Sequence, residues 1–201
     1  LFRSHTLMPV INTPEQLARW KTIASRGTGA AIHVDTGITR LGLSEAELSV
    51  LSRRELEACK IHLIMSHLAC SHDPAHPKNA EQLARFEAAY RPFEGLSASF
   101  ANSAGIFLPS EYHYDLARPG CALYGIHPTS GENPMRHVAT LSAPILQIRT
   151  LTQAETVGYG ATYTAPKGSR IALVGLGYSD GYFRLLGNSG LAYLAGVKVP
   201  I

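Results

Sequence analysis

The 201-residue sequence lacks the features of several protein classes. Only 16% of its residues are charged, the net charge is +3, and no Lys/Arg block or basic stripe with aromatics favours nucleic-acid binding. No apolar run approaches the roughly 20 residues that a membrane-spanning helix needs, and no signal peptide is recognisable. The three cysteines, Cys59, Cys70 and Cys121, are far apart and form no CxxC pair. Reduced thiols in a cytoplasmic protein fit this pattern better than a disulfide framework.

Both ends of the sequence look interrupted. The first residue is Leu1 instead of methionine, and the last, Ile201, falls inside the strand-like run VKVPI. Natural termini usually lie at frayed surface positions, whereas an end inside a strand leaves its ladder unfinished. We therefore expect this chain to be part of a longer protein.

Residues 12–108 alternate between helix-like and strand-like segments. Thr13 with Gln16, and Ser44 with Glu47, have the capping-box spacing of helix starts. The expected helices cover 12–27, 43–59 (continuous or interrupted), 77–90 and 101–108, and the expected strands cover 30–37, 61–67 and 96–100. Such alternation predicts an α/β fold with a parallel sheet wrapped in helices, either a barrel or an open doubly wound sheet.

Polar residues follow each expected strand at the same point. They are Asp35 and Arg40 after the first strand, His67 at the end of the second, Asn102 and Ser103 after the third, and then Arg118 and Gly120 in DLARPGCALYG. A plain turn with a surface arginine is the simpler interpretation of this last stretch taken alone. In a parallel α/β sheet, however, all strand carboxyl ends share one edge, and that edge carries the site. The four groups together therefore predict one functional rim.

The pattern changes after GIHPTSGENPMRH, where Pro128, Gly131 and Pro134 indicate a linker. Beyond it the helical period disappears. Segments 139–153, 168–178 and 191–201 read as strands separated by turn residues. We expect residues 1–130 to form the α/β part and residues 131–201 to begin an all-β domain.

Six motifs in this order resemble the alanine racemase family: HVDTGITRLGL, MSHLACS, ANSAGIFL, DLARPGCALYG, VGYGATYTAP and ALVGLGYSDGYFR. The resemblance implies a fold-type III pyridoxal 5′-phosphate enzyme, with a TIM-like (β/α)8 barrel followed by a β domain. It also implies a cytoplasmic homodimer with shared active sites, which interconverts L- and D-alanine by two-base proton transfer to supply cell-wall peptidoglycan precursors. A whole barrel takes about 250 residues. The chain would then hold the later part of the barrel and the start of the β domain, without the Schiff-base lysine of an early strand.

The resemblance assigns the cofactor contacts to residues of the predicted rim. Arg118 would hydrogen-bond the pyridine nitrogen, and because arginine keeps its proton the ring nitrogen would stay neutral. Ser103 with the backbone at Gly120 and Cys121 would hold the phosphate. His67 would flank the ring. Asn102 is also implied as a cofactor contact.

Three residues are implied to act on the substrate. Arg40 would lie near the cofactor's phenolic oxygen and the substrate end of the site. Tyr159, in VGYGATY, matches the family's second catalytic base, which projects from the β domain of one subunit into the partner's barrel. Tyr178, in GYSDGY, matches a position lining the substrate entry.

Two positions depart from the family pattern. His33 stands where many members carry a lysine that is modified to a carbamate and orients the following arginine, so Arg40 must be held differently. Cys121 stands where members often have an aliphatic residue, and we expect it to pack beside the phosphate. The segment HDPAH, together with His62 and His67, could indicate a metal site. His62 and His67, however, are an odd number of residues apart on the expected strand, so their side chains should point to opposite faces of the sheet. We therefore predict no metal.

Two alternatives to alanine racemisation stay open. A related fold-type III enzyme could be a broad-specificity amino-acid racemase or an amino-acid decarboxylase. A pyridoxal-phosphate-binding barrel without activity is the other, although such barrels lack the β domain that the strands after Met135 predict.

Overall fold

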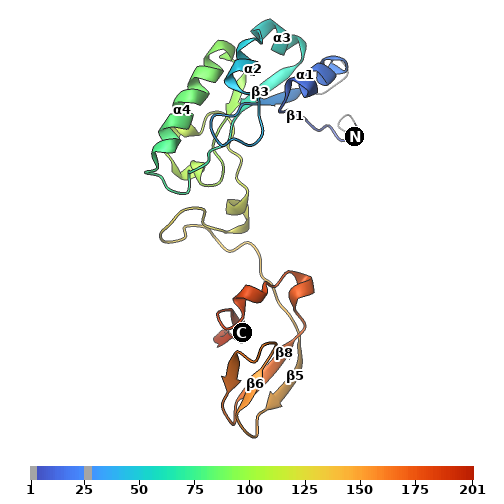
Figure 1. Cartoon of the computed structure of the whole chain (residues 1–201), viewed down its shortest axis with the longest axis vertical. Coiled ribbons are helices and arrows are strands. Elements are labelled where there is room, and N and C mark those ends of the chain that lie inside the picture. The colour runs from blue at the N-terminus through green and yellow to red at the C-terminus, as the bar shows by residue number, and fades with distance from the viewer. Residues whose placement is uncertain (1–3, 25–28) are drawn as a thin grey trace. The chain divides into compact units, whose positions relative to one another are not determined.

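A computed structural model of the chain describes residues 4–24 and 29–201. The chain divides into two compact units, Leu1–Ala139 and Thr140–Ile201 (Figure 1). The first unit contains helices and a parallel sheet, and the second contains antiparallel strands.

The first unit is built on a four-stranded parallel sheet. Its strands are β1 (Val10–Ile11), β2 (Ala30–His33), β3 (Ile61–Met65) and β4 (Ser97–Ser99), in the order β1-β2-β3-β4. Its helices are α1 (Pro14–Lys21), α2 (Glu45–Ser49), α3 (Arg53–Ala58) and α4 (Pro77–Tyr90). Neighbouring strands are consecutive in the chain, which is the order of a barrel, whereas a doubly wound sheet reverses at a switch point. The predicted parallel sheet is confirmed, and β1 is an addition to it.

Helix α1 begins where its capping pattern predicts. The Thr13 hydroxyl accepts the backbone N–H of Gln16 at 3.2 Å. The Gln16 side chain, however, accepts the N–H of Asn12 at 2.7 Å instead of that of Thr13. The carboxyl end of the expected helix, residues 25–27, lies outside the described residues.

The expected helix over 43–59 is interrupted. The predicted Ser44–Glu47 capping box is present and begins α2. A second capping box, formed by Ser52 and Glu55, begins α3. Three residues, 50–52, separate the two helices. The chain can turn there because the Ser52 side chain accepts an N–H group at the start of α3 that a continuous helix would have bonded to an upstream carbonyl.

Aromatic side chains join α4 to the sheet in the core of this unit. The ring of Phe86 stacks on that of Phe100, with centroids 4.8 Å apart, and meets Tyr114 edge-on at 5.0 Å. Phe86 and Phe100 are fully buried. Burying each such ring contributes about 1.5–3 kcal/mol, so α4 is fixed against the strand that ends at the rim.

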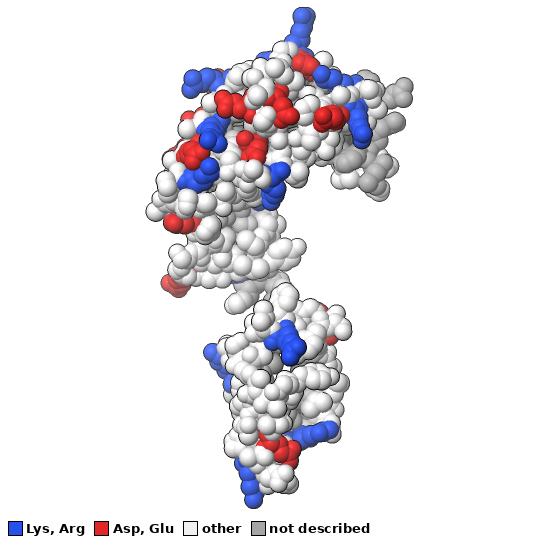
Figure 2. Space-filling model, viewed as in Figure 1, with Lys and Arg blue, Asp and Glu red and all other residues white. Residues whose placement is uncertain are grey.

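Charged side chains of both signs are interspersed on the face of this unit shown in Figure 2. Four ion pairs involve the helices: Lys21–Glu55, Arg53–Glu57, Lys78–Glu81 and Arg85–Glu81. Exposed pairs of this kind contribute little, about 0–1 kcal/mol each. Separately, no helix among the described residues has the length and apolar character to cross a membrane.

The second unit consists of antiparallel strand pairs, so the predicted β character of this part is confirmed. The pairs are β5 (Ile145–Thr150) with β8 (Arg170–Val174), β6 (Glu155–Val157) with β7 (Tyr163–Ala165), and β9 (Leu191–Leu194) with β10 (Val197–Pro200). Strands β6 and β7 are additions to the expected strands, and the segment expected as one strand over 191–201 is a hairpin. Its two turn residues, Ala195 and Gly196, both have positive φ, 48° and 82°, which is typical of the tight turns that join such strands.

Candidate active site

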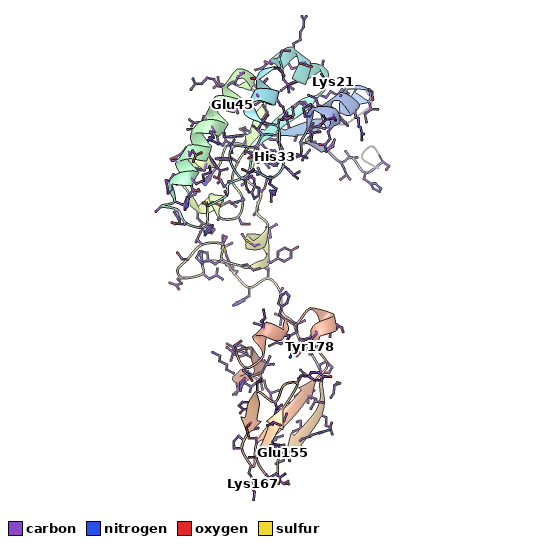
Figure 3. All side chains as sticks on the ribbon, viewed as in Figure 1. Lys21, His33, Glu45, Glu155, Lys167 and Tyr178 are labelled. Carbon is purple, nitrogen blue, oxygen red and sulfur yellow. The ribbon has the colours of Figure 1, made fainter. Side chains whose placement is uncertain are left out.

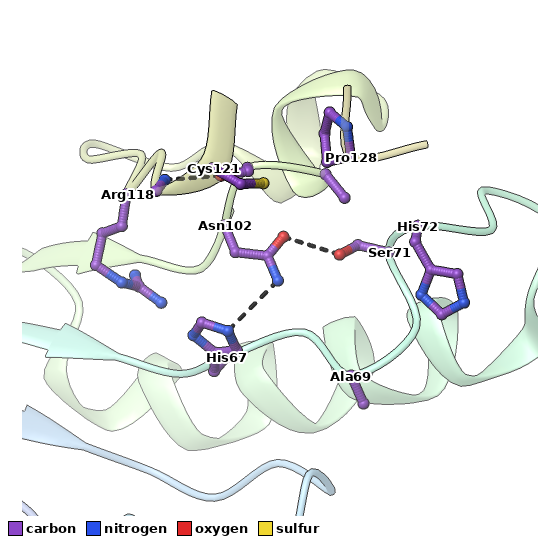
Figure 4. Close-up of a pocket in the computed structure, with 11 residues that line it drawn as sticks. His67, Ala69, Ser71, His72, Asn102, Arg118, Cys121 and Pro128 are labelled. Atoms are coloured by element: carbon purple, nitrogen blue, oxygen red, sulfur yellow. Dashed lines mark hydrogen bonds between the residues drawn. The ribbon is translucent and has the colours of Figure 1, made fainter. Parts of the chain in front are cut away.

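Segments that follow β3 and β4 enclose a pocket of about 340 Å³ in the first unit (Figure 4). It is lined by His67, Ala69, Ser71, His72, Asn102, Ser103, Ala104, Arg118, Gly120, Cys121 and Pro128. Six rim residues named from the sequence therefore meet in one place: His67, Asn102, Ser103, Arg118, Gly120 and Cys121. Arg118 and His67 lie on one side of the pocket and His72 on the other (Figure 4).

Arg118 is held rigidly at this pocket. Its backbone N–H donates to the Ala101 carbonyl at 2.9 Å, and an isolated parallel bridge joins it to Asn102. The two terminal guanidinium nitrogens donate to the Ser99 hydroxyl and the Ser66 carbonyl. Burial lowers the pKa of Arg118, but a guanidinium still keeps its proton at neutral pH. The pocket thus carries a fixed cation whose fork spans the ends of β3 and β4.

A chain of polar side chains orients His67. The Ser71 hydroxyl donates to Asn102 Oδ1 at 2.8 Å, and Asn102 Nδ2 donates to the Leu68 carbonyl at 3.1 Å. The same Nδ2 lies 3.5 Å from His67 Nε2, and as a donor it faces the lone pair of a neutral ring. Burial, followed by the charge of Arg118, lowers the pKa of His67. His67 therefore stays uncharged beside the arginine at neutral pH.

Ser103 and the backbone after Arg118 form a small hollow. The buried Ser103 hydroxyl accepts N–H groups of Gly120 at 2.7 Å and Ala122 at 3.4 Å. A Cβ on Gly120 would lie 3.8 Å from that hydroxyl and would occupy the hollow. The Ser103 oxygen accepts both N–H groups, so its own hydrogen is left to donate, and a hydroxyl beside backbone N–H groups suits phosphate oxygens.

Ser103 does not cap the short helix that follows it. The 3-10 helix Gly105–Phe107 has its first N–H, that of Gly105, bonded to Asn102 Oδ1 at 2.9 Å. The Ser103 side chain is therefore free to serve the hollow, and Asn102 both caps the helix and orients His67.

Two rim residues from the first strand do not line the pocket. Asp35 closes its own turn, because one carboxylate oxygen accepts the N–H groups of Gly37, Ile38 and Thr39 at 2.8–3.1 Å. Arg40 is exposed, although its charge contributes to lowering the pKa of His67. The assignment of Arg40 to cofactor and substrate stays a prediction.

His33 is buried inside the first unit, with 5% of its surface exposed (Figure 3). Its Nδ1 lies 3.0 Å from Asn12 Oδ1, and Asn12 Nδ2 donates to the Val10 carbonyl at 3.1 Å. The Asn12 oxygen is thus an acceptor, which places the ring hydrogen on Nδ1. His33 Nε2 is buried without a hydrogen-bond partner among the described residues. Burial first, and then the charge of Arg118, lower the pKa of His33 to about 4.

This buried imidazole predicts a loss of stability in mild acid. The unfolded chain takes up a proton near pH 6.5 and the folded chain only near pH 4, so the unfolded state binds more protons between these values. The titration of His33 should lower the free energy of unfolding by about 3 kcal/mol as the pH drops through this window, and its contribution does not change further below it. Urea unfolding of the full-length protein at several pH values measures the effect.

The His33→Gln variant removes this titrating group and should reduce the fall over this window by about 3 kcal/mol, while the smaller contribution of His67 stays. The matched control, His137→Gln, replaces an exposed histidine and should keep the acid-side loss. Equal acid sensitivity of the wild type and the His33 variant would contradict the assignment.

The two tyrosines singled out in the sequence belong to the second unit. Tyr159 is 85% exposed and lies between β6 and β7, flanked by Gly158 and Gly160 with positive φ. Tyr178 begins the 3-10 helix Tyr178–Asp180 and is also exposed (Figure 3). Their roles as catalytic base and substrate contact stay predictions.

Three buried polar residues that hold the lining of the pocket in place are not among the site residues that the sequence predicts. Ser66 and Ser99, buried at the ends of β3 and β4, hold the Arg118 guanidinium. Gln82 is fully buried on α4. The sequence does carry a signal for Gln82, because it lies four residues before Phe86 on the inward face of the expected helix, where a polar residue is unusual. Across residues 4–24 and 29–201, no group of three or more His, Cys, Asp or Glu could hold a metal ion.

Comparison with known families identifies the chain. Residues 1–128 match the family described as "Alanine racemase, N-terminal domain", and residues 138–201 match "Alanine racemase, C-terminal domain". The chain belongs to the alanine racemase family. It is 53% identical over 201 residues to alanine racemase of Rhodospirillum rubrum, covering 97% of this chain and 54% of that protein. It is 43% identical to alanine racemase of Rhizobium meliloti, covering 100% of this chain and 57% of that protein.

Solved structures of alanine racemases share the fold. A crystal structure of the alanine racemase from Bartonella henselae, with covalently bound pyridoxal phosphate, matches with a TM-score of 0.86 at 36% identity. That match covers all of this chain and 57% of the other. The Streptomyces coelicolor alanine racemase matches with a TM-score of 0.88 at 29% identity, covering 98% of this chain and 56% of the other. The chain thus spans about half the length of its relatives, and the predicted fold, the later part of a barrel followed by β strands, is confirmed.

Proposed function

We propose that the full-length protein carrying this chain is a pyridoxal 5′-phosphate-dependent alanine racemase that interconverts L- and D-alanine. The observation that supports it most is the anchored Arg118 beside the hollow of Ser103 and Gly120, in a chain of the alanine racemase family. The proposal includes a cytoplasmic location and a role in supplying peptidoglycan precursors.

The donor set of the pocket fits the cofactor. The Ser103 hydroxyl and the backbone of Gly120 and Cys121 would hold the phosphate, and Gly120 has no Cβ to fill the place 3.8 Å from that hydroxyl. Arg118 would contact the ring nitrogen, with neutral His67 beside the ring and Asn102 holding His67 in place. When bound, pyridoxal phosphate withdraws electrons from the substrate's alpha carbon and makes its hydrogen acidic.

Arg118 and Tyr159 would act on two different protons: the one between Arg118 and the ring nitrogen, and the one on the alpha carbon. Arg118 donates a hydrogen bond without giving up its proton, because its pKa stays far above neutral. The ring nitrogen it contacts therefore stays uncharged, which favours return of the proton to the alpha carbon over other outcomes. The Tyr159 phenol would give or take the proton at one face of the alpha carbon, and the family's lysine would serve the other face.

The proposal also concerns assembly. Residues 1–130 would form the cofactor-binding barrel part, and residues 131–201 would begin the β domain. Tyr159 and Tyr178 of one subunit would complete the site of its partner in a homodimer, with Arg40 near the substrate. In that arrangement, a dissociated subunit has no second base and is inactive.

The direct test uses the full-length protein with pyridoxal phosphate. We expect a visible absorption band of bound cofactor, and formation of D-alanine from L-alanine followed with D-amino-acid oxidase. A panel of amino acids, with carbon dioxide release as a second readout, separates a broad racemase or a decarboxylase from an alanine racemase. A protein that shows neither the band nor racemisation would refute the proposal.

Ser103→Ala should weaken cofactor binding about tenfold, or ~1.4 kcal/mol, because one donor to the phosphate is lost from a partly buried hollow. Fluorescence titration of the full-length apoprotein with pyridoxal phosphate measures the dissociation constant. Ser97→Ala, at the exposed beginning of the same strand β4, is the matched control and should bind normally. Equal dissociation constants for the two variants would argue against a phosphate at Ser103.

A further inference from the structure

A glutamine behind the pocket has no place in the proposed mechanism. Gln82 lies on α4, and its side chain is completely buried. Burying an amide costs free energy unless its donors and acceptor are hydrogen-bonded. The partners of this side chain therefore show why it is placed there.

Three hydrogen bonds satisfy the Gln82 side chain. Its Oε1 accepts the Ala69 N–H at 2.8 Å, and its Nε2 donates to the His67 carbonyl at 3.0 Å. Nε2 also donates to the Thr36 hydroxyl at 3.2 Å. The first two bonds fix the backbone on both sides of Leu68. His67 and Ala69 line the pocket. Gln82 therefore fixes the backbone of two lining residues although it does not line the pocket itself.

The hydrogen bond between Gln82 and Thr36 connects Gln82 to Arg118 through Ser66. The Thr36 and Ser66 hydroxyls are 2.7 Å apart, and both residues are buried. Because the Thr36 oxygen accepts from Gln82, its own hydrogen is available to the Ser66 oxygen. The Ser66 carbonyl in turn accepts from the Arg118 guanidinium. We call the set Gln82, Thr36 and Ser66 the rim relay.

We propose that Gln82 is a positioning residue for the cofactor site, which sets the backbone of His67 and Ala69 and, through Thr36 and Ser66, the position of Arg118. The inference deepens the proposed function and rests on it. A fully satisfied buried network selects one arrangement of the groups that it joins. An apolar side chain at Gln82 would leave the Ala69 N–H and the His67 carbonyl unpaired, so the wall would lose its fixed position.

The test compares two isosteric replacements on the same helix in the full-length protein. Gln82→Met removes the amide of the rim relay. Asn79→Leu removes another buried amide, which donates to the Asp73 carbonyl at 2.9 Å and lines no part of the pocket. Both variants should melt at a lower temperature. Only Gln82→Met should weaken pyridoxal phosphate binding about tenfold and change the visible circular dichroism of the bound cofactor.

A second readout needs no cofactor. In the apoprotein, the peptide containing Ala69 should exchange amide hydrogens about tenfold faster in Gln82→Met than in Asn79→Leu, because the Ala69 N–H has lost its acceptor. A wild type that binds no pyridoxal phosphate would refute the proposed function and leave this exchange result standing. A Gln82→Met protein that matches Asn79→Leu in exchange, affinity and dichroism would overturn the inference.

A milder variant keeps the test decisive if Gln82→Met does not fold. Thr36→Val preserves shape and removes only the hydroxyl that joins Gln82 to Ser66. We expect about threefold weaker cofactor binding with an altered dichroism band. Wild-type affinity and dichroism in Thr36→Val would then overturn the inference.

Discussion

Arg118→Lys in the full-length protein should lower both cofactor affinity and racemase activity about 100-fold, or ~2.7 kcal/mol. The guanidinium uses separate nitrogens for the Ser99 hydroxyl and the Ser66 carbonyl. Lysine has one nitrogen on a flexible stem and cannot bridge both while facing the pocket. Fluorescence titration with pyridoxal phosphate and steady-state kinetics measure the two losses.

The control for this variant is Arg91→Lys, which changes an exposed arginine after α4 and should leave both quantities unaltered. Thermal unfolding of both variants identifies any general loss of structure. If Arg118→Lys keeps wild-type affinity, cofactor spectrum and turnover, the fork of Arg118 is not part of the site.

Tyr159→Phe should slow proton exchange at the alpha carbon of one alanine enantiomer about 1000-fold, within the range of general acid–base catalysis. The two enantiomers are equally stable in water, so their equilibrium constant is 1 and kcat/KM must fall equally in both directions. The difference between the two enantiomers is therefore measurable only as a difference in the rate of isotope exchange at the alpha carbon. Loss of deuterium from alpha-deuterated L-alanine and D-alanine, followed by mass spectrometry, should therefore stop for one enantiomer and continue for the other.

Tyr163→Phe is the matched control, because Tyr163 lies in the same hairpin, on β7, and is also exposed. It should exchange both enantiomers at wild-type rates. Small and equal losses for both enantiomers in Tyr159→Phe would exclude the phenol as a base specific to one face.

Local patterns predicted the parallel sheet with its helices and the pocket residues after β3 and β4, but they did not predict β6 and β7 or the placement of Asp35 and Arg40 away from the pocket lining. Capping residues placed the starts of α1 and α2, and the alternation of elements predicted that polar residues after β3 and β4 would meet. The two-residue strand β1 was missed because so short a segment has no periodicity. The sequence does not decide between one helix and the two helices α2 and α3, because the Ser52–Glu55 capping box competes with a continuous helical pattern.

Hydrogen bonds between residues distant in sequence could not be predicted from local sequence patterns. The two N–H groups that donate to the Ser103 hydroxyl belong to residues 17 and 19 positions away. The hydrogen bonds of Gln82 span 13 to 46 residues. The hydrogen on His33 Nδ1 is fixed by Asn12, which the sequence places 21 residues earlier. Such contacts depend on the packed fold, which no local pattern specifies.

The consecutive order β1-β2-β3-β4 has a consequence for biosynthesis. Each of the strands β2, β3 and β4 pairs with the strand that precedes it in the chain, which has therefore already been synthesised. The sheet of the first unit can thus assemble during translation, one strand and helix at a time. The cofactor pocket comes last, because Arg118 pairs beyond β4 only after the whole series is in place.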